Sequence, residues 1–87
     1  MISRAGDWIS ARVGNEAMMM SAERGQYIGL TETAASIWDL LETPRTAEAL
    51  CAELCKEFDV GAAVCRAEVD AFVLEMERRG ALVIREA

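Results

Sequence analysis

Histidine is absent from this 87-residue chain, and proline occurs only once, at Pro44. Without histidine the chain lacks the commonest general base, and a cysteine nucleophile would lack an imidazole partner. No serine lies in a nucleophile-elbow motif, and no glycine-rich loop is placed to hold a phosphate. These absences predict a binding protein rather than an enzyme.

Long apolar runs and positive charge are also scarce. The sequence contains no stretch of about 18 apolar residues, and its N-terminus lacks the apolar centre of a signal peptide. We therefore expect a cytoplasmic protein with no membrane partner. The net charge is −6. This balance argues against a nucleic-acid partner, which needs a basic surface, and favours a partner that carries Lys or Arg.

The three cysteines are too few, and odd in number, for a disulfide framework. Cys51 and Cys55 lie four residues apart in a predicted helix, a spacing compatible with two metal ligands, and Cys65 or a carboxylate could supply a third. The alternative is that all three are small buried hydrophobic residues in a reducing compartment. We favour this alternative and expect no metal and no cofactor.

The first third of the chain has the alternating pattern of β-strands. Strands are predicted over 8–13, 16–21 and 26–30. Gly14-Asn15 is a two-residue hairpin signal, and Gly25 is expected to take left-handed geometry in the second turn. A chain of this length with 53% hydrophobic residues forms one domain, residues 1–87.

Three helices are predicted after the strands. The first covers 32–42 with Thr31 as N-cap, the second begins at the N-cap Thr46 and ends near residue 59, and the third covers 63–79 and stops at Gly80. A short strand could follow over 81–84. This order predicts an α+β domain whose helices lie on one face of a small three-stranded antiparallel sheet. The arrangement resembles a winged helix-turn-helix in which the wing comes first.

The most informative segment is GQYIGLTETAASIWDLLETP, from Gly25 to Pro44. It resembles the signature of the PqqD-like family, the RiPP recognition elements, which bind the leader segments of ribosomally made, post-translationally modified peptides. Thr31 replaces the Asn usual in the family, and both residues cap helices. The matching positions are Gly25, Tyr27, Leu30, Thr33, Ala34, Ile37, Trp38, Leu40 and Leu41.

The resemblance extends over nearly the whole chain, through 45–60 and 67–83. It implies a non-catalytic chaperone that binds a precursor's leader segment and delivers the precursor to a maturation enzyme. That enzyme would be a leader protease, as in lasso peptide maturation, or a radical SAM enzyme, as for PqqD in quinone cofactor synthesis. Tethering the leader would make the modification effectively intramolecular.

The strand over 26–30 carries no charge and no proline, the usual devices that protect an edge from pairing. If it is an edge, a peptide can add to it as a further strand; the alternative is an ordinary structural strand. The resemblance places the peptide groove between this strand and the third helix, which is apolar on two flanks. The expected peptide-binding residues are Gln26, Tyr27, Ile28, Gly29, Leu30, Val69, Asp70, Val73, Leu74 and Glu77.

Two other functions are compatible with parts of the sequence. A winged-helix transcription regulator would need a basic recognition helix, whereas residues 68–77 are mostly acidic or apolar. A small metalloprotein would use the three cysteines.

Overall fold

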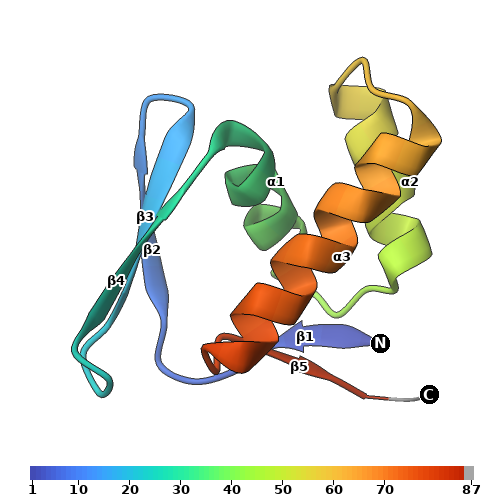
Figure 1. Cartoon of the computed structure of the whole chain (residues 1–87). Helices are drawn as coiled ribbons and strands as arrows, with labels where there is room; N and C mark the ends of the chain where they lie inside the picture. Colours follow the sequence, from blue (N-terminus) through green and yellow to red (C-terminus); the bar gives the residue numbers. More distant parts are fainter. Residues whose placement is uncertain (86–87) are drawn as a thin grey trace.

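The computed structural model describes residues 1–85 and confirms the α+β class, with strands preceding three helices (Figure 1). A short strand at each end of the chain completes the domain. In chain order the elements are β1 (Ile2–Arg4), β2 (Ile9–Val13), β3 (Glu16–Ser21), β4 (Gln26–Leu30), α1 (Glu32–Leu40), α2 (Ala47–Glu57), α3 (Ala62–Arg78) and β5 (Leu82–Ile84).

The predicted wing is present as an antiparallel sheet in the order β2-β3-β4. Val13 pairs with Glu16 across the first hairpin, and Gly14 in its turn has a φ of 66°. The second turn ends at Gly25, whose φ is 63°. Both values lie in the left-handed region that glycine enters without strain, so the two glycines define these turns as expected.

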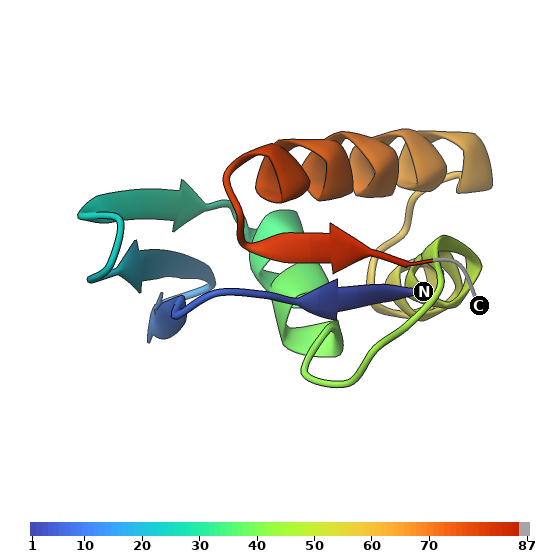
Figure 2. The same cartoon turned by 90° about the horizontal axis from the view of Figure 1, so that it is seen from below.

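A second, two-stranded sheet was not predicted in full. β1 pairs antiparallel with β5, and Ile2 also exchanges two backbone hydrogen bonds with Arg45, at 2.7 and 3.0 Å. The suggested terminal strand is therefore confirmed as β5, whereas its partner β1 was missed. In Figure 2 β5 lies next to α3 and β1 lies on the other side of β5, and both ends of the chain lie on the side away from the wing.

The helix starts agree with the expected caps, since the hydroxyls of Thr31 and Thr46 accept hydrogen bonds from backbone N–H groups of Ala34 and Ala49. The three helices lie on one side of the wing, as expected, but they do not all pack directly on it (Figure 1). α1 packs on β3 and β4, whereas α3 packs mainly on α2 and β5. The cause is the β1–β5 pair, which supplies α3 with its own small sheet.

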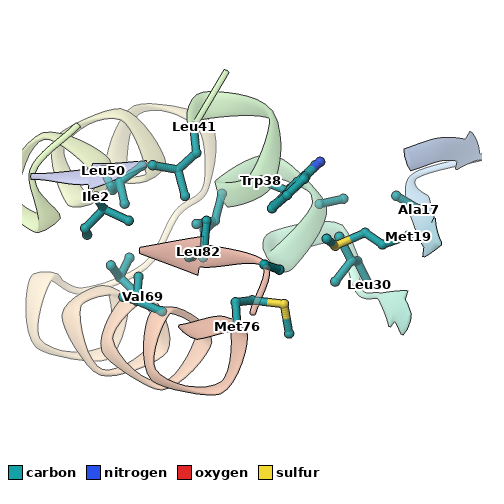
Figure 3. Close-up of a cluster of buried hydrophobic side chains, with 14 of the residues drawn as sticks. Ile2, Ala17, Met19, Leu30, Trp38, Leu41, Leu50, Val69, Met76 and Leu82 are labelled. Atoms are coloured by element: carbon teal, nitrogen blue, oxygen red, sulfur yellow. The ribbon is translucent and has the colours of Figure 1, made fainter. Parts of the chain in front are cut away.

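One hydrophobic core joins the two sheets through α1 (Figure 3). Met19 of β3 and Leu30 of β4 lie on the wing side of Trp38, and Val69 and Leu82 lie on the side of α3 and β5. Trp38 is 1% exposed. The predicted structural role of this tryptophan is confirmed by its burial. α1 thus sets the position of the wing relative to α3.

Candidate peptide-binding site

β4 is an edge strand. Within residues 1–85 its only pairing is with β3, where Tyr27 lies opposite Met20 and Gly29 opposite Met18. In an antiparallel pair, alternate residues of the outer strand direct their N–H and C=O groups away from the sheet. The sequence left open whether the strand over 26–30 is an edge. It is one, so backbone groups of β4 are available to a further strand.

The side chains of β4 divide between the core and the surface as the alternating pattern predicted. Ile28 and Leu30 are buried, whereas Tyr27 is 69% exposed and Gln26 and Gly29 are also exposed. Ile28 and Leu30 therefore hold the strand on the core, and their side chains are not free to contact a ligand. Only the backbone edge and the exposed residues can do so.

A shallow groove continues from the end of β4. It has a volume of about 280 Å³, which is slightly below the range of small-molecule sites and suits one or two side chains of a peptide. Thr31 and residues of α1 line one side of it, and residues of α3 line the other. The lining residues are Thr31, Thr33, Ala34, Ile37, Glu68, Ala71 and Phe72.

The groove does not use the α3 residues that the sequence suggested. Val69 is fully buried and Val73 is 6% exposed, so both belong to the core. Asp70 and Leu74 line a different hollow beside β1 and β5, with Ile2, Ala47, Val73 and Ile84. Glu77 is exposed and, by the helical repeat, lies on that same flank. Asp70, Leu74 and Glu77 therefore lie outside this groove, and their part in peptide binding stays a prediction.

Glu68, Ala71 and Phe72 form the flank of α3 that faces the start of α1, just after β4 ends, and Glu68 and Phe72 were not among the residues predicted from the sequence. A helix with two apolar flanks does not reveal which one faces a particular strand, because that depends on tertiary packing. The only sequence signal for this flank was Ala71, a small apolar residue of the third helix.

The acidic rim of this flank has one carboxylate outside the ion pairs. Glu75 binds Arg79 at 2.7 Å and Arg78 at 2.9 Å, and these two arginines, Arg79 first, lower the pKa of Glu75. Glu68 forms no ion pair within residues 1–85. The groove therefore offers an apolar floor beside one negative charge, a combination suited to an apolar side chain next to Lys or Arg.

The three cysteines differ in environment. Only Cys65 is buried; Cys51 is partly buried and Cys55 is exposed, so the expectation that all three are buried is wrong. Burial, and then the nearby Cys55 and Cys51, raise the pKa of the Cys65 thiol to about 11. Metal binding needs a thiolate, which this shift opposes. Among residues 1–85 no group of three potential metal ligands is close enough to hold an ion.

In the same residues, no helix is long and apolar enough to cross a bilayer.

Fold and site together define a small winged helix-turn-helix-like domain with an open sheet edge beside a groove. The sequence model described as "Coenzyme PQQ synthesis protein D (PqqD)" matches residues 16–82. The chain therefore belongs to the PqqD family. The comparison with curated proteins found no relative of this chain.

Two solved structures share the fold over nearly their full length. One is described as "TbiB1 in Complex with the TbiA(beta) Leader Peptide"; it has a TM-score of 0.84 and 21% identity, and the match covers 98% of this chain and 99% of that one. The other is described as "Lasso peptide synthetase B1 complexed with the leader peptide", with a TM-score of 0.81, 18% identity, and coverage of 95% and 98%.

Proposed function

We propose that this chain is a non-catalytic RiPP recognition element that binds the leader segment of a precursor peptide by adding it to β4. The observation that carries this proposal is the unpaired edge of β4 beside the groove of α1 and α3. Main-chain hydrogen bonds to the edge supply affinity, and the groove supplies side-chain specificity. Membership of the PqqD family and the leader-peptide complexes of similar fold support it.

The leader would lie antiparallel to Gln26–Leu30 and form a fourth strand of the wing. Side chains on one face of that strand would point toward Ala34, Ala71 and Phe72, and a basic side chain would reach Glu68. The chain itself does no chemistry in this scheme. It raises the effective concentration of the precursor at a maturation enzyme in the cytoplasm, where precursor peptides are synthesised.

The partner enzyme in this proposal is a leader protease of the lasso peptide type. The similar fold of lasso peptide synthetase B1 supports maturation of the lasso peptide type, for which the family resemblance implies a leader protease, over a radical SAM enzyme. No observation favours a transcription regulator, since the groove flank of α3 carries Glu68, and Arg78 and Arg79 near the end of the helix are paired with Glu75.

Backbone pairing can be tested on the peptide, because Ile28 is part of the core and its replacement would disturb the fold. Synthetic copies of a candidate leader peptide would carry a single N-methyl group at successive positions. Only alternate residues of an antiparallel strand donate to the neighbouring strand. Binding measured by calorimetry should therefore weaken at least tenfold at every second methylated position and change little at those between.

The peptides methylated at the intervening positions serve as matched controls for the steric effect of the methyl group. A uniform loss, or a loss without the two-residue period, would reject strand addition. Failure of the unmodified leader to bind would reject the proposed function itself.

A further inference from the structure

The cysteines of this chain lie together where α2 packs against α3. Cys51 and Cys55 are one helical turn apart on α2, and Cys65 is near the start of α3. All three are free thiols. None of them lines the leader groove, so the proposed function leaves this cluster without a role.

The register of the two helices brings Cys55 level with Cys65. α2 ends at Glu57 and α3 begins at Ala62, and the two helices form a hairpin (Figure 1). Cys55 and Cys65 lie at nearly equal distances from the middle of this connection. Cys51 lies four residues further from it, which displaces it from Cys55 by about 6 Å along the helix. Cys55 is therefore the better placed partner for Cys65.

The Cys65 side chain is directed at the same turn of α2. Its Sγ atom lies 3.8 Å from the Cys51 carbonyl oxygen, to which the thiol donates a weak hydrogen bond. In an α-helix that carbonyl also accepts the N–H of the residue four positions later, which here is Cys55. Burial, and after it the Cys55 thiol, raise the pKa of Cys65, so the two side chains lie within interaction distance.

The two thiols differ in their access to solvent. Cys55 is exposed, whereas Cys65 is 2% exposed. A reagent in solution therefore reaches Cys55 first, and Cys65 can react only with a group that the protein itself holds. An accessible thiol with a second thiol beside it is the arrangement of a cysteine pair that responds to redox conditions.

We propose that Cys55 and Cys65 form a reversible disulfide between α2 and α3, with a low-molecular-weight disulfide as the oxidant. The Cys55 thiolate attacks one sulfur of the oxidant, whose S–S bond breaks and releases one thiol. The Cys65 thiolate then attacks the Cys55 sulfur of this mixed disulfide and releases the second thiol. The two cysteines lose two electrons and two protons, and the oxidant gains them.

The bond would fasten the start of α3 to the end of α2. It closes a loop of about ten residues and restricts the unfolded chain, so the oxidised domain should be the more stable form. In a reducing compartment such a bond is transient and reports redox conditions. The pair would therefore act as a switch of stability.

The test incubates the reduced chain with glutathione disulfide and follows its mass. A mixed disulfide should appear first, because the raised pKa of Cys65 slows the second attack. It should then convert into a product two hydrogen atoms lighter than the reduced chain. Trypsin cleaves after Lys56 and Arg66, which separates Cys65 from the other cysteines. The product should contain peptides 46–56 and 57–66 joined to each other.

Two alanine variants identify the partner of Cys65. Cys65→Ala should stop at the mixed disulfide, whereas the matched control Cys51→Ala should form the cross-link at the wild-type rate within about twofold. Circular dichroism checks both folds, and the peptide map of the wild type decides the outcome without Cys65→Ala if that variant does not fold. The oxidised wild type should melt at least about 5 °C above the reduced form, and dithiothreitol should reverse the change.

Four results would overturn the proposal. They are a disulfide confined to peptide 46–56, a mixed disulfide that persists in the wild type, a dimer joined through Cys55, and loss of the cross-link in Cys51→Ala. An unchanged melting temperature after complete cross-linking would overturn the effect on stability. These measurements do not involve a leader peptide, so their failure would leave the proposed function as it stands.

Discussion

Trp38 connects α1 with β1 from inside the core. The Arg4 guanidinium carbon lies 4.3 Å from the centre of the indole ring, and the same guanidinium donates a hydrogen bond to the Trp38 carbonyl oxygen at 2.6 Å. The ring therefore combines burial with a cation–π contact. Its own indole N–H has no hydrogen-bond partner within residues 1–85, which subtracts from that stabilisation.

Trp38→Ala should lower the free energy of unfolding by about 3–5 kcal/mol, a large part of the stability of a small domain. Trp38→Phe keeps an aromatic ring and removes the unpartnered N–H, so it should cost clearly less. Urea denaturation followed by circular dichroism measures both variants. A Trp38→Ala protein that melts within a few degrees of wild type would contradict the role assigned to the ring.

Asp7 links the segment before β2 to the turn before β4. Its two carboxylate oxygens accept hydrogen bonds from the Ser21 hydroxyl, at 2.5 Å, and from the Glu23 N–H, at 2.9 Å. The bond from Ser21, and then the bond from Glu23, hold the pKa of Asp7 below its ordinary value of 3.8. The carboxylate contribution to stability is therefore present above the unfolded pKa and is lost as the pH falls through the folded one.

The urea midpoint of the wild type should consequently change little between pH 7 and pH 5 and fall below about pH 4. Asp7→Asn should be less stable at pH 7 and should lose less of its stability on acidification. Glu48 and Glu75, whose pKa values are also lowered, contribute to the acid response in both proteins. Parallel pH curves for the two proteins would show that Asp7 does not contribute in this way.

At the scale of elements, local signals determined most of the outcome. Thr31, Thr46 and the positive-φ glycines at 14, 25 and 80 indicated where strands and helices begin and end, because caps and turns depend on residues close in sequence. The facing of α3 could not be predicted in this way. It depends on whether β4 or β5 lies beside a given flank, which only the tertiary fold decides.

The two flanks of α3 give a prediction with an internal control. Ala71→Glu places a charge in the groove next to Glu68, whereas Leu74→Glu places the same charge three residues further along α3, in the hollow beside β1 and β5, where Leu74 is 66% exposed. Ala71→Glu should weaken leader binding at least tenfold, about 1.4 kcal/mol, and Leu74→Glu should bind as wild type. The reverse pattern in a calorimetric titration would move the peptide to the hollow beside β1 and β5.

On the scale of the whole molecule, the sequence did not predict the pairing of β1 with β5, which joins strands from the two ends of the described chain. β1 has three residues, too few to show an alternating pattern, and its partner β5 lies about 80 residues later. Because this pairing was not foreseen, the wing was the only sheet on which α3 could be expected to pack. The wing, by contrast, is built from neighbouring hairpins, so its strands and their order were predictable.

The pairing of β1 with β5 also brings the ends of the described chain together. The Met1 amino group donates to the Arg85 carbonyl oxygen at 2.6 Å, and the Arg85 N–H donates to the Met1 carbonyl oxygen at 2.9 Å. Domains whose ends meet in this way tolerate circular permutation and insertion into other proteins. The chain can therefore serve as a cassette within a loop of a host protein, entering and leaving at one point, with the wing projecting on the far side (Figure 2).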